Sequence, residues 1–180
     1  MTTFTKNLTL AMALLIIACG GTTKNEEQDI AKNMDELVEE IEEITGEQLS
    51  DELTHADVEK FIKTFPDIVK DMDALDGEVD FGDETTFEAA FKAPKVIAVL
   101  EKYGWGKEFL PKFTVIMTGY SLNKMNEELE NMSEDERKMA AGMMGELIAP
   151  MRELVTEEQQ EIIKEHMGEL GPMFEKLDNN

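Results

Sequence analysis

The sequence predicts an all-α fold, an irregular bundle of about six helices that follows a short N-terminal leader and a flexible tether. Three observations favour this class. Apolar residues recur at intervals of three and four along most of the chain, which is the spacing of one helix face. Several predicted helix starts carry a Ser or Thr that is followed three positions later by a residue able to complete a capping box. The apolar run 96–100 could form a buried strand by itself, but no partner strand is visible elsewhere in the sequence.

The first predicted helix begins near residue 30 and ends at Gly46, which suits a helix C-cap because glycine tolerates the left-handed conformation. Its apolar face consists of Ile30, Met34, Leu37, Val38, Ile41 and Ile44, and its glutamates fall largely elsewhere. The second helix should start after Thr54, whose hydroxyl can cap it while Asp57 sits at the third helical position. Leu53 and Val58 are spaced to form a hydrophobic staple across that start.

Prolines interrupt the second and third predicted helices. Pro66 should kink or split the second helix before it ends near residue 75, because proline lacks a backbone N–H and crowds the preceding turn. The third helix should run from Thr86 to Gly104, with an interruption at Pro94. Its apolar face should consist of Phe87, Ala90, Phe91, Ile97, Leu100 and Tyr103.

The last three predicted helices cover most of residues 109–177. The fourth carries an apolar series that comprises Phe109, Phe113, Ile116, Tyr120, Met125 and Leu129. Capping boxes at 133–136 and 156–159 open the fifth and the sixth. The fifth should turn inward Ala140, Met143, Met144, Leu147, Ile148 and Met151. The sixth should turn inward Ile162, Ile163, Met167, Leu170, Phe174 and Leu177, and it should bend near Gly171 and Pro172.

Residues 1–18 have the features of a secretory signal, with Lys6 in a short first region and an apolar core from about Leu8 to Ala18. A helix over that core would be roughly 17 Å long at ~1.5 Å per residue, against about 30 Å of bilayer hydrocarbon. The segment is therefore short for a membrane span. Cys19, which follows it, is the only cysteine of the chain, and this excludes an intramolecular disulfide. A metal-binding or catalytic role for this thiol is disfavoured because only two histidines exist and a polar, glycine-containing stretch follows it.

The tetrapeptide Ile16-Ile17-Ala18-Cys19 resembles the lipobox of bacterial lipoprotein precursors. The resemblance implies that Cys19 receives a diacylglyceryl thioether, becomes the mature N-terminus and is then acylated on its amine by a fatty acid such as palmitate. Ile replaces the commoner Leu at the first position, and Ile is less usual at the second. Gly20 and Gly21, with no acidic residue directly after the cysteine, are similar to sequences that are passed on to the outer membrane in diderm bacteria. The expected organisation is a signal peptide (1–18, removed), a lipidated tether (19–28) and one acidic helical domain (29–180).

The charge of the chain limits its partners. Its formal net charge is −23, and removal of residues 1–18 would make it one unit more negative because Lys6 is lost. Such a surface repels nucleic acid and anionic lipid headgroups, so neither is expected as a partner. We therefore expect the acyl chains on Cys19 to contact the bilayer while the domain itself stays off it.

No pattern in the sequence identifies a catalytic or metal site. The acidic stretch 76–84 does not match an EF-hand loop, which needs Gly at the sixth and Glu at the twelfth position. A loop that starts at Asp76 has Phe81 and Phe87 at these positions, and one that starts at Asp71 has Asp76 and Gly82. One Glu-x-x-His motif, Glu52 to His55, is half of a ferritin-like di-metal set, but it straddles a predicted helix start. His166 has Ile163 where the second motif needs a glutamate, and it is expected to be semi-buried near an apolar stripe. We expect no enzymatic activity, no metal and no cofactor.

Methionine is the remaining compositional feature, since nine of the 13 methionines lie between Met117 and Met173. Methionine fills irregular core gaps and also lines adaptable binding surfaces, so Met139, Met143, Met144 and Met151 are either core residues or a hydrophobic binding surface. The stretch Val155-Thr156-Glu157-Glu158-Gln159 is similar to the L-T-x-x-Q element of small helical periplasmic chaperones, although its capping box explains Thr and Gln equally well. Three functions stay open: a non-catalytic lipoprotein that binds or scaffolds an unknown envelope component, a holdase-like or hydrophobic-ligand module, and an enzyme with an unrecognised carboxylate or metal site.

Overall fold

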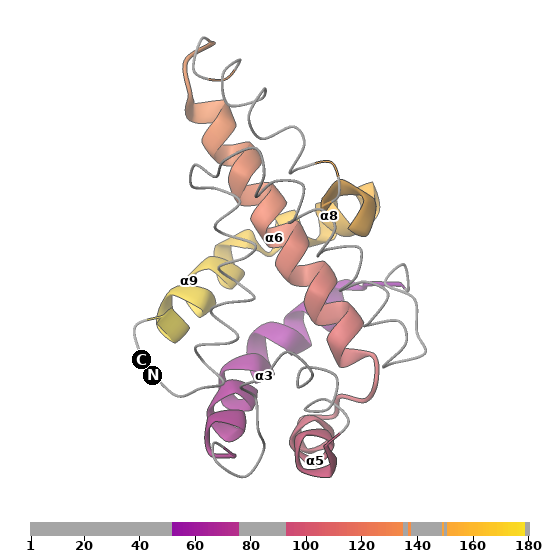
Figure 1. Cartoon of the computed structure of the whole chain (residues 1–180). Coiled ribbons are helices and arrows are strands. Elements are labelled where there is room, and N and C mark those ends of the chain that lie inside the picture. Colours follow the sequence, from indigo (N-terminus) through magenta and orange to yellow (C-terminus); the bar gives the residue numbers. More distant parts are fainter. Residues whose placement is uncertain (1–51, 76–92, 135–136, 138–148, 150, 179–180) are drawn as a thin grey trace, which may run out of the picture.

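A computed structural model describes residues 52–75, 93–134, 137, 149 and 151–178. This part of the chain is helical and contains no strand, which confirms the all-α class. Its complete helices are α3 (His55–Asp73), α5 (Pro94–Lys102), α6 (Phe109–Asn131), α8 (Glu157–Glu165) and α9 (Met167–Asp178). Figure 1 shows α6 as the longest of them, with α5 and α3 near one end and α8 and α9 crossing beside it at different angles. The bundle is irregular because its helices cross at angles rather than running parallel.

Helix α3 begins where the sequence predicts, and for the predicted reason. Thr54 Oγ1 accepts a hydrogen bond from Asp57 N at 3.3 Å, and Asp57 Oδ2 accepts one from Thr54 N at 2.9 Å. These two bonds form the capping box and satisfy two backbone donors at the helix start. Leu53 and Val58 are both buried, as the hydrophobic staple requires. The local sequence therefore determines this end of the helix.

Pro66 lies inside α3 without splitting it. Proline removes only one backbone donor, and buried residues on both sides of Pro66, among them Phe61 and Ile68, hold the two halves against the same core. Of the two predicted outcomes, a kink or a split at Pro66, the split is therefore wrong. The helix ends at Asp73, two residues before the expected end, with Ala74 as its C-cap.

Helix α5 confirms that residues 96–100 are helical, but it shows an error in the predicted face. Pro94 is the first residue of this helix, and Val96 and Leu100 are its buried residues. Ile97, which was expected inward, is 40% exposed. The expected face continued the series from Phe87 across the proline, whereas a helix that begins at Pro94 takes its own register. Gly104, with φ of 75°, ends this region in the left-handed conformation that glycine favours.

Helix α6 passes through the core, as its predicted apolar series indicates. It is buried on several sides between residues 109 and 125, and the buried set includes the polar residues Thr118 and Asn123. Gly119 faces α8 so closely that a Cβ atom added there would overlap Ile163 Cδ1. The absence of a side chain at Gly119 therefore allows α6 and α8 to approach.

The predicted sixth helix is divided into α8 and α9. Its capping box is confirmed, because Gln159 N donates to Thr156 Oγ1 at 3.2 Å and Gln159 Oε1 accepts from Thr156 N at 2.9 Å. The break falls at His166, which caps α8, and not at the expected Gly171 and Pro172, since Pro172 lies inside α9. Ile163, Leu170 and Phe174 are buried as predicted. Met167, Ile162 and Leu177 are partly buried against the core.

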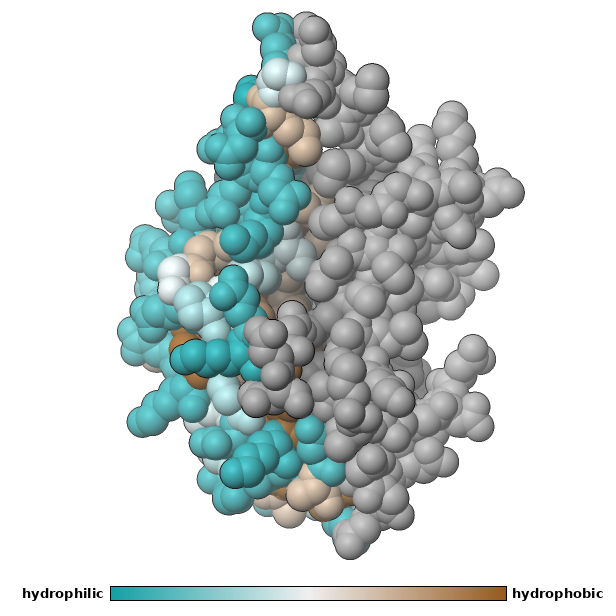
Figure 2. Space-filling model, turned by 90° about the vertical axis from the view of Figure 1, so that its left-hand side faces the viewer, coloured by the Kyte–Doolittle hydropathy of each residue, from teal (hydrophilic) through white to brown (hydrophobic). Residues whose placement is uncertain are grey.

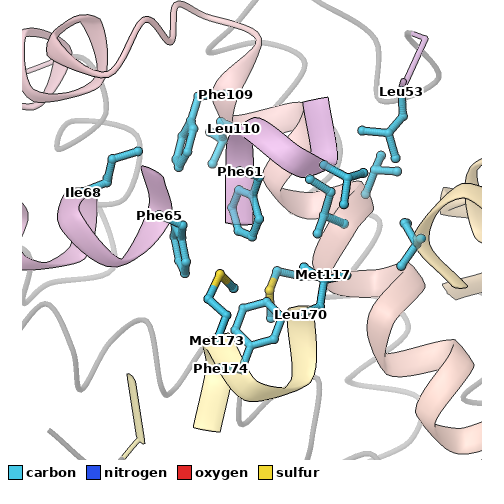
Figure 3. Packing of buried hydrophobic residues seen from close by; sticks show 14 of the residues in the cluster. Leu53, Phe61, Phe65, Ile68, Phe109, Leu110, Met117, Leu170, Met173 and Phe174 are labelled. Carbon is cyan, nitrogen blue, oxygen red and sulfur yellow. The ribbon is translucent and has the colours of Figure 1, made fainter. Parts of the chain in front are cut away.

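The core joins α3, α6 and α9 through aromatic and methionine side chains (Figure 3). Phe61 and Phe65 of α3 stack with ring centroids 4.5 Å apart, and Phe174 of α9 lies 6.4 Å from Phe61 and 6.3 Å from Phe65. Trp105 is also buried, and its Nε1 donates to Thr64 Oγ1 at 2.9 Å. The first predicted helix, the acidic stretch 76–84 and most of the fifth helix lie outside the described residues.

Candidate functional site

Cys19, the predicted lipid attachment residue, lies outside the described residues, as does the rest of 1–51. The signal peptide, the lipobox and the tether therefore stay predictions from the sequence. None of the helices in the described part of the chain combines the length and the apolar composition that a membrane crossing needs.

The methionine set is only partly described. Met151 is 1% exposed and belongs to the hydrophobic core, so its side chain does not contribute to an exposed binding surface. Met117, Met125 and Met173 are also buried in this core. Met139, Met143 and Met144 lie outside the described residues. The methionines that the structure describes as buried fill gaps between helices, which is one of the two roles considered for this residue type.

The half-motif from Glu52 to His55 has the arrangement that its position at a helix start implies. Glu52 is exposed and precedes the helix, whereas His55 is the first residue of α3. Within the described residues, no group of three or more His, Cys, Asp or Glu side chains is placed to hold a metal ion. The two residues of the half-motif thus do not form part of a ferritin-like cluster in this region.

The structure instead brings together the only two histidines of the chain. His55 Nδ1 and His166 Nε2 are 3.2 Å apart, and the ring centroids are 5.4 Å apart at an interplanar angle of 54°. His55 comes from the first turn of α3 and His166 from the junction of α8 and α9, so the contact joins residues 111 positions apart. A nitrogen–nitrogen hydrogen bond of this kind needs one N–H and one lone pair.

The surroundings of His166 favour one arrangement of these protons. The residue is 9% exposed, and its Nδ1 is buried with no hydrogen-bond partner in the described part of the chain. A buried N–H without an acceptor is less tolerated than a buried lone pair. We therefore assign the hydrogen of neutral His166 to Nε2, from which it is donated to Nδ1 of His55. Nε2 of His55, whose side chain is 52% exposed, then carries the other hydrogen.

A carboxylate lies close to the histidine pair. Glu165 Oε2 is 4.0 Å from His55 Nδ1, and the side chains of His55 and Glu165 are 52% and 63% exposed. The contact is an ion pair only when His55 is protonated, and because both side chains are exposed, water screens it and it contributes little to stability. Protons can therefore reach the pair from solvent on the His55 side.

A second charged cluster fixes the same end of α3. Lys112 Nζ of α6 is 2.7 Å from Asp57 Oδ1, and both side chains are less than one-fifth exposed. Burial by itself raises the pKa of Asp57, but the hydrogen bond from Lys112 and those from Thr54 together outweigh burial and hold this pKa below its ordinary value. Asp57 therefore completes the helix cap and ties α3 to α6 at once.

A third cluster ties the other end of α3 to α5. Asp71 Oδ2 accepts hydrogen bonds from Lys102 Nζ at 2.6 Å and from Tyr103 Oη at 2.8 Å. The bond from Lys102, followed by that from Tyr103, lowers the pKa of Asp71, and the bond to Asp71 raises the pKa of Tyr103. The phenol is thus held protonated, which suits a structural donor and not a base.

A polar hollow of about 290 Å³ lies between the C-terminal half of α6 and α8, and it is lined by Asn123, Asn126, Glu127, Leu129, Glu130, Arg137 and Lys164. The Arg137 guanidinium donates to the carbonyl oxygens of Leu129, Glu130 and Met132 at 3.0–3.3 Å. It therefore satisfies the free carbonyls at the end of α6. Asn123 Nδ2 donates to Gln160 O at 3.2 Å, which joins α6 to α8. Both side chains act in the fold, and none of the described residues that line this hollow is aromatic or a methionine.

No protein-family model, curated protein or solved structure matches this chain. The site with the most distinctive chemistry in the described residues is the pair of His55 and His166, which the sequence does not predict. The sequence signal for it is weak, since it consists of two histidines that each lie at a helix end.

Proposed function

We propose that this chain is a lipid-anchored protein of the bacterial cell envelope, attached through acylated Cys19, whose helical domain binds or scaffolds another envelope component without catalysis. The proposal rests on the order of three features at the N-terminus: an apolar segment, the tetrapeptide Ile16-Ile17-Ala18-Cys19 that ends it, and a polar stretch that follows. In a diderm cell the glycines after Cys19 favour the outer membrane over the inner one.

The surface chemistry of the domain supports anchoring by lipid and not by the domain itself. Ile97 is the only large hydrophobic side chain that is strongly exposed among the described residues. Figure 2 shows hydrophilic residues over most of the described part of one face. Together with a net charge of −23, this composition disfavours contact with an anionic bilayer. A tether attached at Cys19 would therefore hold a water-exposed, acidic domain near the membrane.

A non-catalytic role is supported by how the described polar clusters are used. Asp57 and Asp71 each fix one end of α3, and Arg137 satisfies the end of α6. These groups have structural partners within the fold, and so they are not poised for a substrate. A holdase-like role would need an apolar groove, and Met151 is buried in the core instead. That alternative depends on Met139, Met143 and Met144.

The test is membrane fractionation of the full chain in its native cells, followed by cross-linking and affinity capture. Wild-type protein should sediment with membranes, resist extraction by high salt and alkali, and capture a defined envelope protein. Cys19→Ser should abolish metabolic labelling by an acyl-chain analogue and leave the longer precursor. Thr22→Ser is the matched control, since it changes the tether conservatively and should keep labelling and capture intact. Acyl labelling of Cys19→Ser at the wild-type level would overturn the anchor, and capture of unfolded client proteins alone would favour the holdase-like role.

A further inference from the structure

A stripe of buried residues runs along one side of α6. Its members are spaced alternately four and three positions apart: Pro111, Val115, Thr118, Leu122 and Met125. Leu129 and Met132 continue the same spacing and are partly buried. These residues together are called the α6 stripe. Alternation of four and three is the heptad spacing by which one helix packs along the length of another.

We propose that the α6 stripe is the docking surface of residues 138–150, which lie along it as the middle of one helix from Glu134 to Leu154, antiparallel to α6. Most of these residues lie outside the described part of the chain, but both of their flanks are described. The stripe is then closed by the chain itself and is not a groove for another molecule. This docking is a property of the helical domain and does not depend on the lipid anchor.

The other two sides of α6 carry contacts with other described helices. Gly119 faces Ile163 of α8 so closely that an added Cβ would overlap it. On the side of α3 and α9, the ring of Phe113 lies 6.1 Å from that of Phe61, and the ring of Tyr120 lies 4.9 Å from that of Phe174. Successive residues are turned by ~100° about a helix axis, which puts these three positions of α6 outside the stripe. Burial of the stripe therefore points to a third neighbour.

The chain that leaves α6 turns straight back beside it. Helix α6 ends at Asn131, and Glu134 is helical again. Arg137 N donates to Ser133 O at 2.9 Å, which is a helical bond between residues four apart. The Arg137 guanidinium also donates to Leu129 O at 3.0 Å, so the first turn of the new helix is fixed to the last turn of α6. Two helices joined by so short a connection are antiparallel neighbours.

The other flank shows which way this new helix faces. Residues 151–154 are helical, with Met151 1% exposed and Leu154 partly buried. Exposed positions surround them: Ala149, Arg152 and Glu153. This distribution is that of a helix with one face inward. Carried back from Met151 at heptad spacing, the inward face meets only apolar residues: Leu147, Met144 and Ala140.

The register and the length of the two surfaces agree. The contact between Arg137 and Leu129 sets which residues lie opposite one another. Heptad steps from this contact, taken in opposite directions along the two helices, give two pairs: Leu122 with Met144, and Val115 with Met151. A helix over 134–154 and the α6 stripe are each about 30 Å long at ~1.5 Å per residue. The two apolar faces therefore match from end to end.

Attachment at both ends favours residues 138–150 over a separate molecule. A second copy of the chain or a hydrophobic client would have to compete with a segment whose two flanks are covalently joined to the helices on either side. Such attachment gives the segment a high effective concentration at the stripe. Docking also places Met144 in the core, as Met151 is, so Met144 is not available to an exposed binding surface.

The test is oxidation of the full chain in detergent by dilute hydrogen peroxide, with peptide mass mapping of each methionine. Met144 and Met125 should both be oxidised about tenfold more slowly in native protein than in concentrated urea, because both are closed within one seam. Their protection should not change when the protein is diluted. Three results would overturn the docking: oxidation of Met144 at its rate in urea, loss of protection on dilution, which would indicate a second copy, and rapid oxidation of Met125, which would indicate an open groove.

Leu122→Ala tests whether Met144 is protected by the α6 stripe itself. It removes the side chain opposite Met144, so Met144 should be oxidised about threefold faster than in wild type. Met117 serves as the internal reference for general loosening, since it is 3% exposed and Figure 3 shows it beside Leu170, away from the stripe. The rate for Met144 divided by that for Met117 should therefore rise.

Ile116→Ala is the matched control, because it truncates a fully buried side chain of the same helix that lies outside the stripe. It should not raise the ratio of the Met144 rate to the Met117 rate. Should either variant lose helicity by circular dichroism, Leu122→Val and Ile116→Val decide in the same way. An equal change of the ratio in both variants would contradict docking of residues 138–150 on the α6 stripe.

Discussion

Gly119 sets the distance between α6 and α8, and replacing it by Ala tests the packing of the bundle directly. A Cβ atom there would overlap Ile163 Cδ1, and Ile163 has no exposed surface. Overpacking of this kind costs about 1 to 3 kcal/mol. Removal of glycine from a helix interior returns about 0.5 to 1 kcal/mol, so Gly119→Ala should lower the free energy of unfolding by about 1 kcal/mol in total.

A double-mutant cycle with Ile163→Val isolates the clash, because valine lacks the Cδ1 atom that the new methyl group meets. Ile163→Val alone should cost about 0.5 to 1.5 kcal/mol, whereas adding it to Gly119→Ala should cost much less or restore stability. Gly168→Ala in α9 is the control, since its new Cβ would meet no atom of the described residues within 4 Å apart from its chain neighbours and its own helix backbone, and it should not destabilise the protein. Urea unfolding followed by circular dichroism measures all four variants. Strict additivity in the cycle, or stabilisation by Gly119→Ala, would refute this reasoning.

Three further predictions use the same unfolding assay. Asp57→Asn should cost about 1 to 2 kcal/mol at pH 7, because it breaks the charged bond to Lys112. Folding lowers the pKa of Asp57, so the stability that its carboxylate contributes is present above the ordinary pKa near 4 and is lost as the pH falls below that value. The difference in the free energy of unfolding between wild type and Asp57→Asn should therefore be smaller at pH 3 than at pH 7. A larger difference at pH 3 would contradict the lowered pKa. Trp105→Phe should cost about 1 to 2 kcal/mol, since it leaves Thr64 without the indole donor, and a neutral effect would contradict the bond. Met151→Leu should change stability by less than about 1.5 kcal/mol, and mild peroxide should leave Met151 unoxidised in native protein; its early oxidation would contradict its burial.

Local chemistry explains which parts of the fold the sequence predicts well. The starts of α3 and α8 depend on Thr54 and Thr156, each of which bonds to a residue three positions later, so four residues contain the whole signal. The predicted face of α5 was wrong at Ile97 because it continued an apolar series across Pro94, whereas α5 begins at Pro94 and buries Val96 and Leu100.

Contacts between distant segments explain what the sequence does not predict. The break at His166 has no glycine or proline beside it, and the residues that would signal a bend, Gly171 and Pro172, lie within α9. The contact between His55 and His166 depends on how α3, α8 and α9 pack, which no spacing within either segment encodes. Burial of Met151 is likewise a tertiary property, because methionine suits both a core and an exposed groove.

The most direct test of the central claim is the mass of the N-terminal peptide of the protein isolated from its native membrane. The lipid-anchor proposal predicts a peptide that begins at Cys19 and carries a diacylglyceryl group on sulfur, with or without a further acyl chain on the amine. A peptide that begins at Met1, or at any residue other than Cys19, or that carries an unmodified thiol at Cys19, would contradict it.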